Sequence, residues 1–225
     1  MCSIDSSLVA VIILESREIH FIRVTTNGRL VQDRKLNLQH DCSGIAHHHG
    51  NLYITSGIAL YPYSLDGTLL RKLYDDTTGL YKSSSCAVSH DGERIYVANK
   101  SIKSIDFQLV TLSRDGIVIS KLTEHEICLS ERFPPGLHVT DSGQVLVYYE
   151  FSKNIFQIDR DGREKLAVVV RSKNKEPLSV FFSKRTGSLI MGARDNNNIK
   201  VFKTQRLLEN DDKSQFRYTS VKLIV

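Results

Sequence analysis

Short apolar or alternating segments recur along the chain, and turns rich in glycine separate them. Apolar residues alternate with polar ones, or run together, over 51–55, 59–65, 94–98, 109–112, 145–149 and 155–158. Alternation with a period of two is typical of a half-buried β-strand. No segment has the 3.6-residue period of an amphipathic helix. The pattern therefore predicts an all-β protein.

Two series of turns divide these strands into repeats. The first series contains the glycines Gly50, Gly92, Gly143 and Gly187, which are 42, 51 and 44 residues apart. The second series is Asn27-Gly28, Asp66-Gly67, Asp115-Gly116 and Asp161-Gly162. Asn-Gly and Asp-Gly supply the positive φ angles that two-residue hairpin turns need. A period near 45 residues built from short strands is the signature of a β-propeller with four-stranded blades.

The repeat predicts about five blades within residues 1–205. Four units begin near Cys42, Cys86, Gly136 and Ser179, and a fifth, partial unit covers 8–38 without a clear first turn. We expect 31–38 to be the strand that closes the ring on the Ser179 unit. The tail 206–225 is then surplus, as an edge strand or a loosely attached segment. An open ring would leave an unpaired edge, so the chain reads as a shortened or incomplete propeller.

Small residues mark the first strand of each unit. They are Cys42, Gly44, Cys86, Gly136 and Ser179. The innermost strands of a propeller crowd around its axis, where small side chains permit close approach. We therefore assign Cys42 and Cys86 a packing role. The four cysteines contain no CxxC motif, which favours reduced thiols in a cytoplasmic protein.

Composition narrows the function classes only slightly. The chain has 225 residues, 41% of them hydrophobic, and a formal net charge of +5. This balance suits a globular domain with a core, and it is too mild to indicate nucleic acid by itself. There is no run of about 18 apolar residues, so we expect no membrane span.

Enzyme chemistry finds little support in the residues. His47-His48-His49 alternate between the faces of a strand, so at most two of them share a face, and we expect no metal site. The acidic residues Asp66, Asp91, Asp115 and Asp161 fall in turns, where they serve turn geometry. No phosphate-binding loop or nucleophile elbow is present. We expect no catalytic residue and no cofactor. A metal-dependent, lactonase-like hydrolase is the weakest alternative.

A family resemblance rests on longer stretches. These are 34–57, 135–140, 143–147, 155–162 and 196–202. They resemble the NHL-like C-terminal propeller of the tripartite-motif (TRIM) proteins of bivalve molluscs, over roughly residues 20–203. The resemblance implies a propeller, usually six-bladed, that selects partners. In that family a RING finger carries ubiquitin-ligase activity, but this chain has no Cys/His array with zinc-ligand spacing and no coiled-coil heptads. We therefore expect a non-catalytic protein-interaction module, the partner-recognition propeller of a TRIM-like protein.

The loops on one face of the predicted propeller are the best place for a partner. Function on rigid folds concentrates in loops, and aromatic and arginine side chains are favoured at protein interfaces. The candidate binding residues are Tyr81, Lys100, Arg132, Phe133, Tyr149, Lys153, Arg194 and Asn196. These loops contain nine basic and eight acidic groups, whereas a phosphate-binding surface should be strongly basic. We expect a protein partner, with RNA as the alternative.

Overall fold

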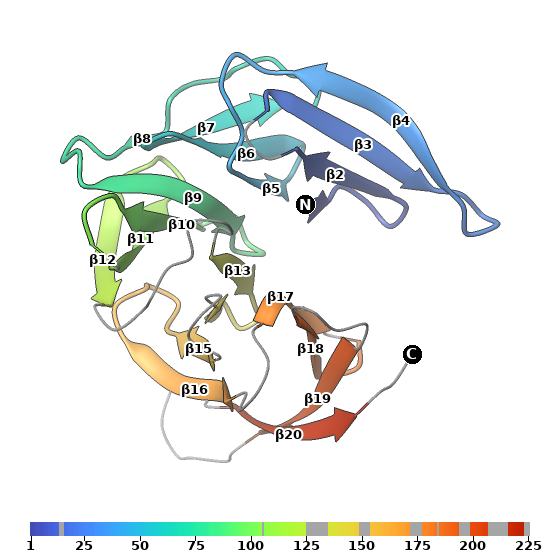
Figure 1. Cartoon of the computed structure of the whole chain (residues 1–225), viewed down its shortest axis with the longest axis vertical. Helices are drawn as coiled ribbons and strands as arrows, with labels where there is room; N and C mark the ends of the chain where they lie inside the picture. Colours follow the sequence, from blue (N-terminus) through green and yellow to red (C-terminus); the bar gives the residue numbers. More distant parts are fainter. Residues whose placement is uncertain are drawn as a thin grey trace.

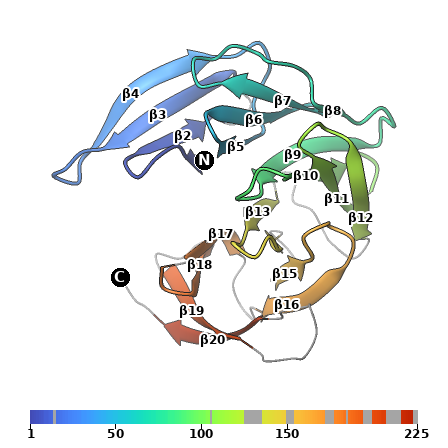
Figure 2. The same cartoon turned by 180° about the vertical axis from the view of Figure 1, so that it is seen from behind.

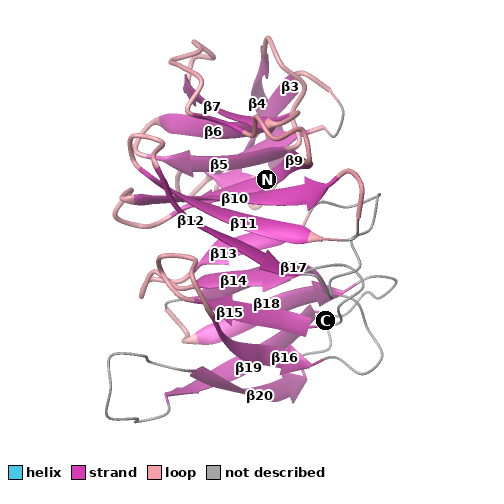
Figure 3. Cartoon of the chain, turned by 90° about the vertical axis from the view of Figure 1, so that its left-hand side faces the viewer, coloured by secondary structure: helices cyan, strands magenta, loops and turns pink. Residues whose placement is uncertain are grey.

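The chain is described here from a computed structural model. It describes residues 1–13, 16–104, 106–124, 135–148, 154–171, 177–183, 185–193, 199–206 and 216–222. In these ranges the structure consists of strands, turns and bends, with no helix (Figure 3). The strands form five four-stranded antiparallel sheets, which confirms the predicted propeller of four-stranded blades.

Each sheet is one blade, and its strands follow chain order. Blade 1 contains β1 (Cys2–Ser3), β2 (Leu8–Ile12), β3 (Glu18–Val24) and β4 (Leu30–Asn37). Blade 2 contains β5 (Gly44–His48), β6 (Asn51–Ser56), β7 (Ala59–Ser64) and β8 (Tyr74–Asp75). Blade 3 contains β9 (Tyr81–Val88), β10 (Arg94–Ser101), β11 (Phe107–Ser113) and β12 (Val118–Glu124).

The last two blades repeat the same order. Blade 4 contains β13 (Gly136–Val139), β14 (Val145–Tyr148), β15 (Asn154–Ile158) and β16 (Lys165–Arg171). Blade 5 contains β17 (Pro177–Ser183), β18 (Ser188–Ala193), β19 (Ile199–Arg206) and β20 (Phe216–Lys222). The predicted glycine turns join these strands, and glycines such as Gly50, Gly92 and Gly143 have positive φ.

The predicted closure of the ring is wrong. The segment proposed to complete the last blade is β4, which pairs with β3 of its own blade. The fourth strand of blade 5 is β20, which pairs with β19 from Lys200↔Lys222 to Arg206↔Phe216. The tail, predicted to be an edge strand or a loosely attached segment, therefore contains a regular strand, the outermost one of blade 5.

The first unit is also complete rather than partial. Strand β1 pairs with β2 through Cys2↔Ala10 and Ser3↔Val9. The turn between them uses an aspartate in place of a glycine: the Asp5 carboxylate accepts hydrogen bonds from the backbone amides of Ser7 and Leu8, at 2.7 and 2.9 Å. An aspartate that bonds its own backbone in this way replaces the glycine turn of the other repeats.

The first strands of the blades pack against one another around the axis. Gly44 shows why small residues stand there, because a Cβ at this position would lie 2.6 Å from the Cα of Ser85 in the next blade. Cys86 is buried, and its thiol lies 3.2 Å from the carbonyl oxygen of Tyr53. Burial raises the pKa of the Cys42 thiol to about 11. Both cysteines therefore pack as buried thiols with no thiolate character.

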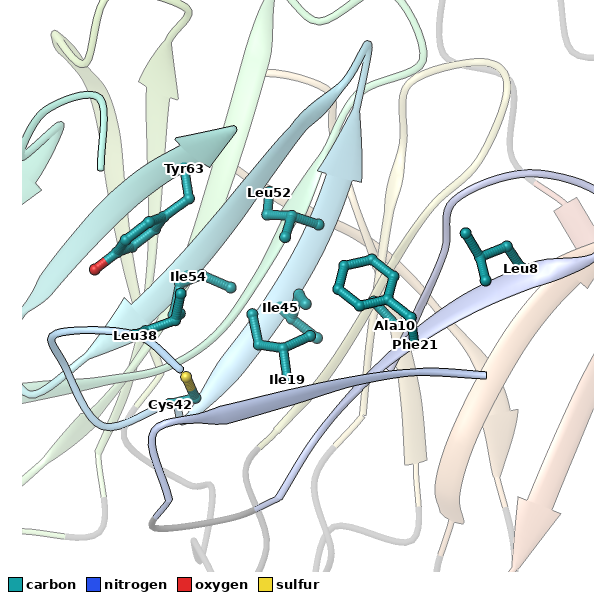
Figure 4. Close-up of a cluster of buried hydrophobic side chains, with 10 residues drawn as sticks. All are labelled: Leu8, Ala10, Ile19, Phe21, Leu38, Cys42, Ile45, Leu52, Ile54 and Tyr63. Carbon is teal, nitrogen blue, oxygen red and sulfur yellow. The ribbon is translucent and has the colours of Figure 1, made fainter. Parts of the chain in front are cut away.

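Four hydrophobic clusters hold consecutive blades together. The cluster between blades 1 and 2 includes Phe21 on one sheet and Leu52, Ile54 and Tyr63 on the other (Figure 4). Equivalent clusters join blades 2 and 3, 3 and 4, and 4 and 5. Each interior blade thus buries apolar side chains on both of its faces, which is the face-to-face packing that the sheet needs.

The turn between the third and fourth strands of a blade contacts the outer part of the preceding blade. Gly67 packs against Leu36, and a Cβ at Gly116 would overlap the carbonyl oxygen of Leu73. Gly162 lies against Thr111, and the Ser120 hydroxyl donates a hydrogen bond to the Gly162 carbonyl oxygen at 3.1 Å. We call this contact the turn capture. Blades 2, 3 and 4 each make this contact with the blade that precedes them in the chain.

The five blades form an arc rather than a closed ring. Figures 1 and 2 show blade 1 and blade 5 at its two ends, with an opening between them. Among the described residues, the hydrophobic clusters join the four consecutive blade pairs and none joins blade 5 to blade 1. The two end blades consequently pack on one side only.

The turn capture can be measured with a matched pair of substitutions. Gly28 and Gly116 both have positive φ, so Gly→Ala at either should cost about 1 kcal/mol through backbone strain. Gly116→Ala should cost about 1–3 kcal/mol more, because the added Cβ meets the Leu73 backbone. Urea denaturation of both variants gives the difference directly. Equal losses would contradict the turn capture as a tight contact.

The contact between blades 4 and 5 predicts a pH dependence. His138 lies on β13, with its ring centroid 5.1 Å from that of Phe181 in β17, and burial lowers its pKa. The unfolded chain therefore takes up this proton first as the pH falls. The stability contributed by the neutral ring should be complete above pH 6.5, the ordinary histidine value, and lost as the pH falls through the folded pKa. Urea denaturation at several pH values between 5 and 8 measures the free energy of unfolding as a function of pH. This free energy should change less with pH in His138→Gln than in the unsubstituted chain.

Candidate functional site

Three large aliphatic side chains stand exposed on neighbouring loops of blades 2 and 3. Ile58 lies in the turn between β6 and β7, Leu80 lies between β8 and β9, and Ile102 lies between β10 and β11. They are 39%, 41% and 51% exposed. We call Ile58, Leu80 and Ile102, together with the adjoining Tyr81, the loop-face patch. Exposed apolar groups that lie together indicate an interaction site more often than single ones do.

Backbone hydrogen bonds tie the three loops together. The Ile102 amide donates to the Leu80 carbonyl oxygen at 2.9 Å, and the Asp76 amide donates to the Ile58 carbonyl oxygen at 2.8 Å. A third bond runs from the Ser83 amide to the Gly57 carbonyl oxygen at 2.8 Å. The loops are therefore held in one arrangement by the backbone, and a partner would not have to order them.

A buried carboxylate organises the loop that contains Leu80. Asp76 is buried, and its two carboxylate oxygens each accept the Thr78 hydroxyl at 2.9 Å. One of these oxygens also accepts the Tyr81 amide at 3.2 Å. The Leu80 amide donates to the Thr78 hydroxyl at 3.2 Å. A carboxylate that satisfies several donors in this way fixes a loop conformation.

A buried polar chain lies beneath the same loops. The Ser83 hydroxyl donates to the side-chain oxygen of Asn99 at 3.1 Å, and the Asn99 amide lies 3.3 Å from the Tyr74 hydroxyl. Burial raises the pKa of the Tyr74 phenol, so this hydroxyl stays protonated. The chain connects β8, β9 and β10, and a satisfied buried network of this kind rigidifies its surroundings.

Lysines and acidic side chains both lie around the patch. Lys82 and Lys103 are exposed beside it. Among the nearby acids, Asp76 is buried in its own hydrogen bonds, Asp75 forms an ion pair with Lys72 at 2.5 Å, and Asp106 accepts the Ser104 hydroxyl at 2.7 Å. The patch therefore combines aliphatic groups with exposed lysines, which suits an apolar surface rimmed by carboxylates.

Two of the eight predicted binding residues fall within the described residues. Tyr81 is the first residue of β9 and Lys100 lies in β10, at strand ends rather than in loops, with the register Lys100↔Lys82 and Ser101↔Tyr81. The structure thus places these two on neighbouring strands next to the patch. The other six, Arg132, Phe133, Tyr149, Lys153, Arg194 and Asn196, lie outside the described residues.

Sequence reasoning missed the three aliphatic residues of the patch. It searched the loops for aromatic and basic side chains and did not consider aliphatic ones. A signal was present at two of them, since Ile58 and Leu80 each directly follow a glycine with positive φ, Gly57 and Gly79. A large apolar residue directly after a turn glycine lies where the chain reverses, and so at the surface.

Two kinds of feature are absent from the described part of the chain. No group of three His, Cys, Asp or Glu side chains there has the arrangement to hold a metal ion. No helix there has the length and apolar character of a membrane span.

The sequence matches no protein-family model, and no curated protein matches it. Solved structures do resemble the fold. A protein of unknown function from Bacteroides caccae has a TM-score of 0.61 at 16% identity, over 95% of this chain and 73% of that one. A chain of the nidogen/laminin complex has a TM-score of 0.62 at 14% identity, over 87% and 73%. The computationally designed Ika4 protein has a TM-score of 0.52 at 13% identity, over 72% and 91%. At such low identity these likenesses support the propeller fold alone.

The role of Asp76 can be tested by removing its carboxylate. Asp76→Ala leaves the Thr78 hydroxyl and the Tyr81 amide without their acceptor, which should cost about 1–3 kcal/mol. Amide hydrogen exchange of residues 77–81 should accelerate, while the amides of β11 keep their protection. Asp75→Ala is the matched control, because its ion pair with Lys72 is partly exposed and should contribute little. Similar exchange in both variants would contradict the role given to Asp76.

Proposed function

We propose that the chain is a non-catalytic protein-interaction module that docks a partner protein on the loop-face patch. A β-propeller is commonly such a module, and the observation that supports this role is the patch itself. Ile58, Leu80 and Ile102 keep large exposed areas on loops that backbone hydrogen bonds hold in place. Exposed apolar side chains on a rigid support match the anchors of a protein interface.

The finer form of the proposal is partner recognition in a TRIM-like protein. It rests on the resemblance of 34–57, 135–140 and 155–162 to the propellers of that family. In such proteins the propeller selects the partner, and a RING finger carries the ubiquitin-ligase activity. The chain described here would contribute recognition only.

RNA is the second candidate, and the composition of the patch disfavours it. Recognition of single-stranded RNA relies on aromatic stacking and a basic surface. The patch offers three aliphatic side chains and one tyrosine, with Lys82 and Lys103 as its exposed cations. Binding of a protein to the patch should therefore depend only weakly on salt, whereas RNA binding would fall steeply with salt concentration.

The test compares the proteins captured by the unsubstituted chain and by three single variants. Leu80→Asp and Ile102→Asp place a charge in the patch, and each should reduce capture of a specific partner by more than tenfold, as expected at an interface anchor. Ile117→Asp is the matched control, because Ile117 is an apolar residue that is 69% exposed at the opposite end of blade 3. A partner supports the proposal when it binds the unsubstituted chain and Ile117→Asp but neither patch variant.

Two outcomes would count against the proposal. Capture that all three substitutions leave unchanged would place the interaction elsewhere on the molecule. Capture that nuclease treatment abolishes, with a steep loss between low and physiological salt, would favour the RNA alternative.

A further inference from the structure

The two end blades of the arc each present one sheet face that no hydrophobic cluster of the described residues covers, although the Phe181 ring on β17 contacts His138 of blade 4. On blade 1 this face contains Val9, Val11 and Ile22, aligned across the sheet by the pairs Val9↔Ile22 and Val11↔His20. On blade 5 it contains Phe181, Ile190, Ile199 and Val201, aligned by Ile190↔Phe181 and Ile190↔Val201. We call these the first end face and the last end face.

The second strands of the other blades show which contact the first end face lacks. In blades 2 to 5 the second strand turns two apolar residues toward the preceding blade, and all eight are fully buried: Leu52 and Ile54, Ile95 and Val97, Val145 and Val147, and Leu189 and Met191. Val9 and Val11 occupy the same positions in β2 and remain partly exposed. Blade 1 therefore has the residues of a blade interface without the blade that would cover them.

The turn of blade 1 shows the same vacant contact. In blades 2, 3 and 4 the turn between the third and fourth strands is captured by the preceding blade, through Leu36 at Gly67, Leu73 at Gly116 and Thr111 at Gly162. The corresponding turn of blade 1 is Thr25 to Arg29, with Gly28 at φ +77°. No described atom outside its own chain neighbours lies within 4 Å of a Cβ built at Gly28.

The last end face is the other half of this interface. Phe181 is 55% exposed and Ile199 is 45% exposed, whereas Leu189 and Met191 on the opposite face of blade 5 are fully buried. Figure 1 shows blades 1 and 5 on the two sides of the opening of the arc. An occupant of this opening would meet apolar side chains on both of its sides.

We propose that the two end faces form one docking site for a partner protein that inserts a single antiparallel β-sheet with apolar side chains on both faces. The four blade interfaces of this chain supply the template for both contacts. The turn capture at Gly67, Gly116 and Gly162 indicates that the sheet's outer strand would lie against the turn at Gly28. On the first end face, Glu18 pairs with both His20 and Lys35 at 3.0 Å and borders the apolar area with polar groups.

A second copy of the chain does not meet this requirement. The occupant needs two free faces, while each end blade of a second copy has one free face and its interior blades have none. A partner sheet that is free on both sides therefore fits the site better than self-association does.

The experiment uses the chain's own blade 3 as the probe sheet. Residues 81–124 are appended again after residue 225 through a flexible linker, so that the tether raises the effective concentration of the added sheet. Phe181→Cys reports on the opening through its rate of modification by a maleimide, located by mass spectrometry. Ile117→Cys, on an exposed turn away from the opening, is the reference. In the extended chain the Phe181→Cys rate should fall about tenfold or more, and the unfolding midpoint should rise.

The control extension contains Val97→Asp within the appended copy. This substitution places a charge on one apolar face of the added sheet, so the rate at which Phe181→Cys is modified should equal that of the unextended chain. A rate as fast in the first extended chain as in the control would overturn the proposal. Slow modification of Phe181→Cys in the unextended chain would also overturn the proposal, because the opening would then already be closed. The molecular mass in solution would show whether a second copy closes it or whether it closes within one molecule.

A second measurement does not depend on the extension folding. Val11→Asp should lower the unfolding midpoint of the unextended chain far less than Val97→Asp does, because Val97 is fully buried between blades and Val11 lies on an open face. Equal losses would show that the first end face is covered and would overturn the proposal.

Discussion

Face-to-face packing of apolar sheets is the interaction on which the rest of this structure depends. A four-stranded blade with apolar residues on both faces cannot bury them alone, so each blade depends on packing against at least one neighbour. Leu52 and Ile54 in blade 2 are fully buried because blade 1 covers them. The small residues near the axis and the captured turn glycines serve the same packing, since they let neighbouring sheets approach.

The sequence allowed the blades to be predicted but not their ends. Asn-Gly and Asp-Gly turns have a local cause, the positive φ of glycine, so they could be recognised without any tertiary information. The first blade was underestimated because its initial hairpin turns on Asp5 and its inner strand has only two residues. The closing strand was misassigned because both 31–38 and 216–222 can serve as outer strands. Which sheet each strand joins depends on chain geometry that no local pattern encodes.

The candidate site was predictable only in its general location. The repeat placed the correct loops on one face, and Tyr81 and Lys100 do lie beside the patch. The patch itself depends on three loops brought together by the Ile102–Leu80 bond and the buried Asp76 carboxylate. These contacts link residues that are far apart in the sequence or hidden in a polar network. Residue type alone therefore could not distinguish Leu80 from the strand leucines around it.

The two surfaces differ in how they depend on the arc. The loop-face patch lies at the junction of blades 2 and 3, where hydrophobic clusters support blade 2 on both sides and blade 3 on both sides. In an array whose units are stabilised by their nearest neighbours, such interior units keep their structure when the ends fray. Blades 1 and 5 each pack against one neighbour only, so their free energy of local unfolding must be lower than that of blades 2 and 3. Occupation of the opening would stabilise blades 1 and 5 most and the patch least, because binding stabilises the units that it contacts. The patch can therefore hold its geometry whether the opening is filled or empty.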